Sequence, residues 1–98
     1  MKVTITSLHF KTDQKLDQFI QEKIEKLSGV FNNIISSDVI LKLDNHEKQE
    51  NKIAEIRLSV RGNDLFAKKQ CKTFEEAVDL SVDALRRQLK KHKEKIRQ

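Results

Sequence analysis

Cationic side chains gather at the carboxyl-terminal end of the chain. Residues 86–98 contain seven Lys or Arg and one Glu, whereas residues 1–85 contain thirteen Lys or Arg and fourteen Asp or Glu. One or two cations stabilise a helix end by about 0.3–1 kcal/mol each, but seven repel one another unless an anionic partner neutralises them. Lys and Arg bind phosphates with release of counterions. The charge pattern therefore predicts a polyanionic partner, and phosphate binding would explain the excess of cations. The alternative interpretation is a solvated helix end.

A helical projection separates these cations from an apolar line. At about 100° per residue, one line is formed by Leu85, Leu89, His92 and Ile96. The cations project away from this line or lie on its flanks, and they are Arg86, Arg87, Lys90, Lys91, Lys93 and Lys95. These are the candidate phosphate-binding residues of the last helix.

Two lysines of an earlier helical segment are further candidates. Lys23 and Lys26 lie on the Phe19 edge of that segment rather than opposite its apolar side. Lysines in such positions also cover apolar neighbours with their aliphatic stems while the ammonium group stays in water. The pattern alone supports both interpretations equally.

Other reactive residue types lack the partners that catalysis or metal binding needs. Asp79 and Asp83 are one helical turn apart, as paired acid–base carboxylates or metal ligands could be, but no His or Cys joins them at ligand spacing. No histidine stands in a triad-like context, and Cys71 is interpreted as a small core residue. We therefore predict no catalytic residue, no metal site, no cofactor and no enzymatic activity.

The length and composition bound the class of protein. Ninety-eight residues favour one domain, here residues 1–98. The single cysteine excludes an internal disulfide, no run of about 18 apolar residues predicts a membrane span, and the first six residues do not resemble a signal peptide. A soluble, monomeric cytoplasmic protein is the expectation.

The periodicity of apolar residues predicts the elements that carry these side chains. Alternation predicts strands near residues 2–8, 35–43, 54–60 and 65–72. In the second strand we expect Ile35, Val39, Leu41 and Leu43 on one face. The stretch 44–51 has no apolar residue and is expected to be an exposed hairpin loop.

Two helices are predicted from apolar residues at three- and four-residue steps. Thr12 or Asp13 can cap the first helix, and Gly29 is expected to end it in a left-handed conformation. Residues 73–76, Thr-Phe-Glu-Glu, match a capping box at the start of the second. The order is β-α-β-β-β-α, which predicts an α+β two-layer sandwich with a four-stranded sheet.

The last helix resembles a known family motif. Residues 83–95, D-A-L-R-R-Q-L-K-K-H-K-E-K, are similar to the D-K-L-x-R-Q-L-x-K-H-K-x-K ending of the short form of the ribosome hibernation-promoting factor and ribosome-associated inhibitor family. Residues 77–79 resemble that family's A-I-D segment, and Leu16, Phe19, Lys23 and Lys26 recur at its spacing. Ala84 stands where the family usually has Lys.

This resemblance implies a fold, a partner and a mechanism. Both helices should lie side by side on one sheet face. The protein should bind rRNA of the small ribosomal subunit, and so the whole ribosome, in the channel of mRNA and tRNA. It should block translation by steric exclusion in stress or stationary phase. Ribosome dimers in short relatives involve a separate small factor. By the resemblance, the rRNA-binding positions are Lys23, Lys26, Arg87, Lys91, His92, Lys93 and Lys95, with Arg86 and Lys90 beside them.

Two other functions remain open on the sequence alone. The chain could be another structured-RNA-binding module, although its strand order and lack of stacking aromatics differ from an RNA-recognition motif. It could also be an adaptor whose basic helix binds an acidic protein.

Overall fold

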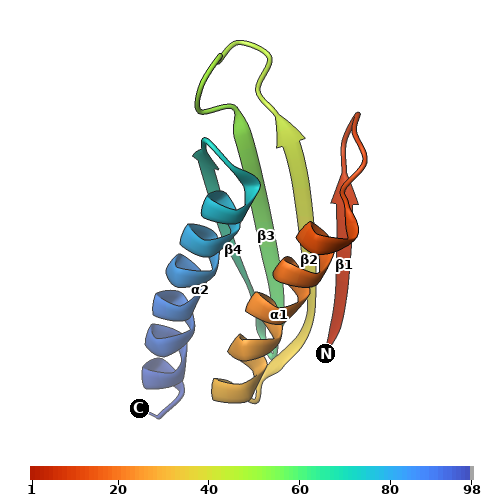
Figure 1. Ribbon diagram of the computed structural model, residues 1–98. Helices are drawn as coiled ribbons and strands as arrows, with labels where there is room; N and C mark the ends of the chain where they lie inside the picture. The colour runs from red at the N-terminus through yellow and green to blue at the C-terminus, as the bar shows by residue number, and fades with distance from the viewer. Residues whose placement is uncertain (98) are drawn as a thin grey trace.

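Four strands form one mixed sheet, and both helices cover the same face of it (Figure 1). The computed structural model describes the backbone of residues 1–97 and the side chains of residues 1–92. The elements in chain order are β1 (Lys2–Ser7), α1 (Gln14–Val30), β2 (Ile34–Leu43), β3 (Lys52–Val60), β4 (Asn63–Cys71) and α2 (Phe74–Arg97). The predicted β-α-β-β-β-α order and two-layer sandwich are confirmed.

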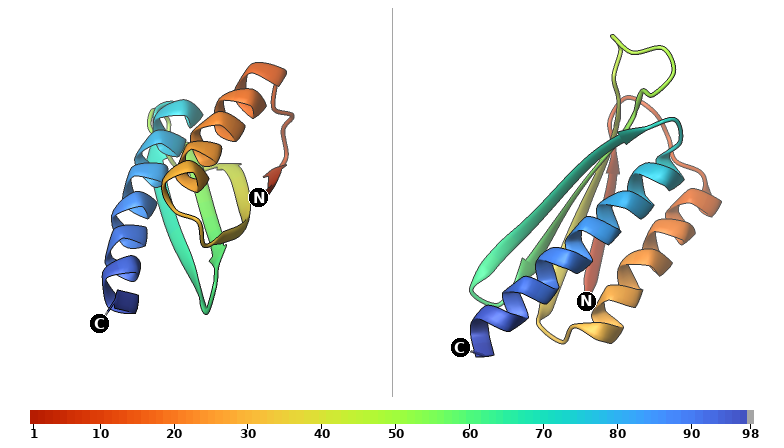
Figure 2. Two further views of the ribbon diagram at one scale, coloured as in Figure 1. Left: turned by 90° about the horizontal axis from the view of Figure 1, so that it is seen from below. Right: turned by 90° about the vertical axis from the view of Figure 1, so that its left-hand side faces the viewer.

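The strands follow one another across the sheet in the order β1-β2-β3-β4. β1 pairs with β2 in parallel, because α1 carries the chain back between them. β2, β3 and β4 pair antiparallel, and Gly62 turns the chain between β3 and β4 with a φ of 86°. This left-handed φ costs a glycine little. Figure 2 shows the helices lying side by side over the sheet, with the 44–51 loop extending beyond it.

The start of β2 differs from the predicted alternation. Ile34 is buried, with 8% of its surface exposed, whereas Ile35 is 61% exposed. The pairing register of β2 and β3 shifts between Ile34 and Ser36, and such a bulge moves the side chains before it to the other face. Val39 and Leu41 are buried as predicted, but the expected position of Ile35 on their face is wrong. Leu43 is exposed because it lies at the strand end, next to the loop.

Helix α1 begins and ends through specific backbone contacts. The Asp13 carboxylate accepts the Leu16 N–H at 2.7 Å, which confirms one of the two predicted caps. The helix ends when Phe31 becomes extended, and its N–H still donates to the Leu27 carbonyl at 2.9 Å. Gly29 is helical, so its predicted left-handed conformation is wrong. A half-buried Phe31 packed against the core fixes the change of direction instead.

Helix α2 begins at the predicted place, with the Thr73 half of the predicted capping box formed. The Thr73 hydroxyl accepts the Glu76 N–H at 3.1 Å, and the Phe74 ring stacks on Phe10 with centroids 5.0 Å apart. Its buried side includes Val78, Val82, Leu85 and Leu89, so the predicted burial of Leu85 and Leu89 on the apolar line is confirmed. The side chain of Ile96, the last predicted member, lies outside the described residues.

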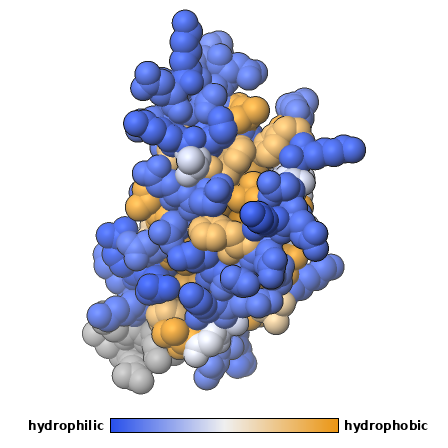
Figure 3. Space-filling view, in the orientation of Figure 1, coloured by the Kyte–Doolittle hydropathy of each residue, from blue (hydrophilic) through white to orange (hydrophobic). Residues whose placement is uncertain are grey.

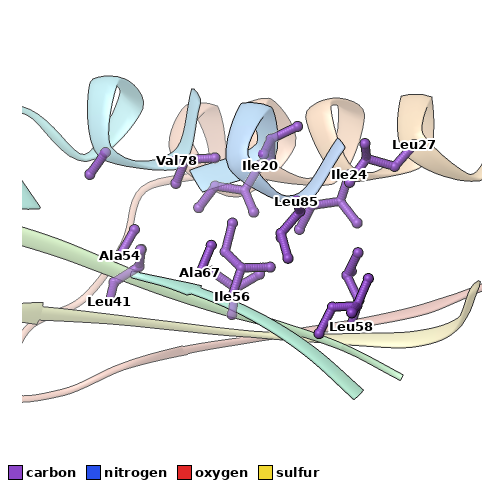
Figure 4. Packing of buried hydrophobic residues seen from close by; sticks show 14 of the residues in the cluster. Ile20, Ile24, Leu27, Leu41, Ala54, Ile56, Leu58, Ala67, Val78 and Leu85 are labelled. Carbon is purple, nitrogen blue, oxygen red and sulfur yellow. The ribbon is translucent and has the colours of Figure 1, made fainter. Parts of the chain in front are cut away.

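The core lies between the helices and the sheet (Figure 4). Ile20 and Ile24 of α1 lie near Leu85 of α2 above Ile56 of β3, and Leu27 lies farther along α1, above Leu58; all are fully buried. Burial of a side chain of this size stabilises a fold by about 1.5–3 kcal/mol. This packing holds both helices on one face, so their polar sides form a common surface. Within residues 1–97, neither helix is long and apolar enough to cross a membrane.

Candidate nucleic-acid interface

Cations of both helices meet in a groove between them. Lys23 and Lys26 of α1 lie beside Arg86 of α2 in a hollow of about 210 Å³. The Lys23 ammonium is 2.9 Å from an Asp79 carboxylate oxygen and 5.5 Å from the centre of the Phe19 ring. This inter-helix groove brings Lys23 and Lys26 together with Arg86, which lies about sixty positions later in the chain.

The remaining described cations of the motif lie on the outer side of α2. Arg87, Lys90 and Lys91 are exposed and border a shallow hollow of about 560 Å³ with Ala84 and Gln88. The Gln88 amide donates to the Phe66 carbonyl of β4 at 3.0 Å, which ties this part of the helix to the sheet edge. The predicted projection of these cations away from the apolar line is confirmed.

His92 has different surroundings from the lysines beside it. Its half-buried ring lines a hollow of about 110 Å³ with Leu89 and with residues 30–33, which are the last residue of α1 and the three that follow it. Its Nε2 atom is buried, and no described group forms a hydrogen bond with it. The ring thus faces the end of α1 rather than the outward cations. The side chains of Lys93 and Lys95 lie outside the described residues. The rRNA-binding assignment of every candidate residue stays a prediction.

Two carboxylates line the inter-helix groove among its cations. Asp79 pairs with Lys23 across the helices, and Asp83 lies 3.9 Å from Arg87 one turn along α2. The sequence showed these aspartates only as unsupported candidates for catalysis or metal binding. The pairing of Asp79 across helices was missed, because it depends on how two distant segments pack. In the described part of the chain, no three His, Cys, Asp or Glu residues gather as metal ligands would.

Cys71 has the environment of a core residue. Its side chain is buried at the end of β4, with 5% of its surface exposed. Burial raises the pKa of the thiol, and the nearby Glu76 and Glu50 carboxylates raise it further. A thiolate nucleophile requires the opposite shift, so the structure favours the predicted structural role.

The surface above both helices is predominantly hydrophilic, with apolar side chains showing between them (Figure 3). Charge and shape together suit a polyanion better than a small molecule. A phosphate-binding surface requires exposed Lys and Arg from elements held in fixed relative positions. Here α1 and α2 supply them, and the shared core holds them.

Comparison with known proteins supports the predicted family. A model of the family described as Sigma 54 modulation protein / S30EA ribosomal protein matches residues 3–97. A ribosome hibernation promoting factor of Pseudomonas putida is 35% identical over 95 residues, 97% of this chain and 89% of that protein. One from Escherichia coli K12 is 30% identical over 98 residues, 100% of this chain and 99% of that protein.

Two solved structures share the fold. A ribosomal subunit interface protein from Coxiella burnetii superposes with a TM-score of 0.85 at 19% identity, covering 95% of this chain and 98% of its own. The N-terminal domain of Thermus thermophilus Protein Y superposes with a TM-score of 0.81 at 18% identity. The match covers 94% of this chain and 99% of that domain. The matched length and sequence identity establish the relationship, and the chain belongs to the S30EA family of bacterial ribosome hibernation promoting factors.

Proposed function

We propose that the protein binds rRNA of the small ribosomal subunit in the decoding channel and excludes mRNA and tRNA sterically. The observation that carries the proposal is the meeting of Lys23, Lys26 and Arg86 in one groove between two helices. Arg87, Lys90 and Lys91 extend the positive surface along α2. The family and the names of the relatives support a role in ribosome hibernation.

The shape of the molecule suits exclusion. Its principal extents are 46 × 24 × 17 Å, so it is an elongated wedge. Helices packed on a sheet through a shared core give this wedge a rigid surface. Occupying a channel that substrates must enter requires only binding, with no chemical step. The proposal implies a cytoplasmic location, where ribosomes are.

Phosphate contacts supply most of the expected affinity. Lys and Arg that neutralise phosphates release counterions, so affinity falls as salt concentration rises. Such contacts position a protein on RNA by shape and carry little sequence information. Binding to folded rRNA is therefore expected to depend on the spacing of phosphates around the helices.

The test replaces Arg87, Lys90 and Lys91 together with Gln. All three side chains are exposed, so folding should be unaffected. Binding to small subunits should weaken strongly, and the slope of log affinity against log salt should fall by up to about three units. A matched control replaces Lys48, Lys68 and Lys72, which are exposed elsewhere, with Gln.

Unchanged affinity and salt slope in the first variant, with normal melting, would remove the outer side of α2 from the interface. Sedimentation with and without RNase separates the other candidate functions. If the protein still sediments with other proteins after the RNA is digested, it is an adaptor that binds protein. Binding to free RNA but not to ribosomes would indicate a different RNA target.

A further inference from the structure

The inter-helix groove contains negative charge where a polyanion is expected to bind. Asp79 and Asp83 line it together with Lys23, Lys26 and Arg86. The side chains of the two aspartates are 59% and 58% exposed. An approaching phosphate therefore meets exposed carboxylates as well as cations.

Helix stability does not account for these two aspartates. The acidic residues that complement the helix dipole, Glu75 and Glu76, already occupy the first turn of α2, and the dipole effect fades beyond that turn. Asp79 and Asp83 are four residues apart, a spacing at which like charges destabilise a helix. The ion pair of Asp83 with Arg87 is solvent-exposed and that of Asp79 with Lys23 is partly exposed, and pairs near the surface contribute little.

The aspartates alter what the groove can bind. Lys23 already donates to Asp79 at 2.9 Å, so a phosphate must share this ammonium group with a carboxylate. A regular run of phosphates along the groove would also lie beside Asp79 and Asp83 and be repelled by them. An RNA surface can instead present a hydrogen-bond donor at this place, such as a 2′-hydroxyl or a base amino group. The carboxylates would accept a hydrogen bond from that donor.

We propose that Asp79 and Asp83 are specificity-determining residues that weaken binding to nucleic acid in general more than binding to the ribosome. The proposal rests on the proposed function, because it takes the helical face as the rRNA-binding surface. Cations alone would bind any duplex, and cellular RNA and DNA offer many competing sites. Carboxylates placed among the cations repel phosphates and so weaken binding to nucleic acid that offers only a regular phosphate backbone.

The experiment compares two double variants of equal charge. Asp79→Asn/Asp83→Asn and Glu47→Gln/Glu50→Gln each raise the formal net charge from +5 to +7, and the second pair lies in the exposed 44–51 loop. Affinity is measured for a short duplex RNA, a duplex DNA of the same sequence and purified small subunits, in one buffer. The Asn variant should bind both duplexes about tenfold more tightly than the loop variant, with little change toward small subunits.

A third variant, Asp79→Glu/Asp83→Glu, keeps the charges and should retain wild-type discrimination. Thermal melting of each variant verifies folding, which the exposure of all four positions favours. Equal increases in duplex affinity in the Asn variant and the loop variant would overturn the inference, because overall charge would then explain both increases. Equal gains toward duplexes and small subunits would also overturn it, as would no gain at all.

The same measurements separate this inference from the proposed function. If the wild-type protein fails to bind small subunits, the proposed function is wrong, whatever the duplex affinities show. If it binds them and the Asn variant discriminates as wild type does, only the role of the aspartates is wrong.

Discussion

His92 and its neighbouring lysines show how residues of one short motif acquire different surroundings. Lys90 and Lys91 extend into solvent, whereas His92 packs at the end of α1 with a buried, unpartnered Nε2 among the described residues. A buried polar atom without a partner costs stability. Because Nε2 is buried against the end of α1, this atom is not presented to rRNA, and the predicted contact of His92 with rRNA stays a prediction.

Ser81 offers a direct test of the cost of an unpaired polar group. Its side chain is fully buried in α2, and its hydroxyl has no described hydrogen-bond partner. Ser81→Ala removes that hydroxyl and increases helix propensity. We expect the free energy of unfolding to rise by about 1 kcal/mol, which corresponds to roughly 4–8 °C in melting temperature for a domain of this size. A lower melting temperature would show that the hydroxyl is paired in solution.

Cys71 gives a prediction that depends on pH. Because burial raises the pKa of its thiol, less thiolate is present in the folded protein than in the unfolded chain at a given pH. Alkylation by iodoacetamide should therefore be slow in the native state and become appreciable only at higher pH than in denaturant. Mass spectrometry of timed samples measures both rates. Equal rates would mean that β4 opens readily at its end.

At the scale of elements, α2 has a buried apolar side and an exposed cationic side, and the proposed function assigns binding to the exposed side. Leu89 is 2% exposed and lies on the apolar line, whereas Arg87, Lys90 and Lys91 are exposed. Leu89→Ala should lower the free energy of unfolding by roughly 2–5 kcal/mol, because it removes buried methyl groups and leaves a cavity. Urea unfolding measures this loss.

The Arg87, Lys90 and Lys91 to Gln variant is the natural control for that measurement. Its free energy of unfolding should stay within about 0.5 kcal/mol of the wild-type value, as is usual for surface substitutions. Under conditions where Leu89→Ala is still folded, the Leu89→Ala protein should bind ribosomes normally. Weak binding by a fully folded Leu89→Ala protein would show that the core position of α2 also sets the geometry of the interface.

At the scale of the whole molecule, steric exclusion makes a prediction about competition. A wedge that occupies the decoding channel must reduce tRNA binding to empty small subunits, and less so at high salt. Filter binding of labelled tRNA, with increasing protein, measures this effect. The Arg87, Lys90 and Lys91 to Gln variant should compete poorly. Full simultaneous occupancy by tRNA and protein would contradict exclusion while leaving ribosome binding intact.

Much of the fold follows from local sequence. Apolar residues recurring every second or every third and fourth position predicted all four strands and both helices, and short-range hydrogen bonding predicted the caps at Asp13 and Thr73. These features involve residues only a few positions apart, so backbone geometry alone relates them to the sequence. The basic motif of α2 likewise indicates the family, because it is one continuous run of residues.

Tertiary structure decided what depends on distant segments. It placed β1 parallel to β2 and turned Ile35 outward through a bulge against β3. It also ended α1 at an extended Phe31 rather than at a left-handed Gly29. It also brought Lys23 to Asp79 and directed His92 toward the end of α1. Each outcome depends on the register and packing of elements far apart in the chain, and local periodicity carries no information about which partner a side chain will meet.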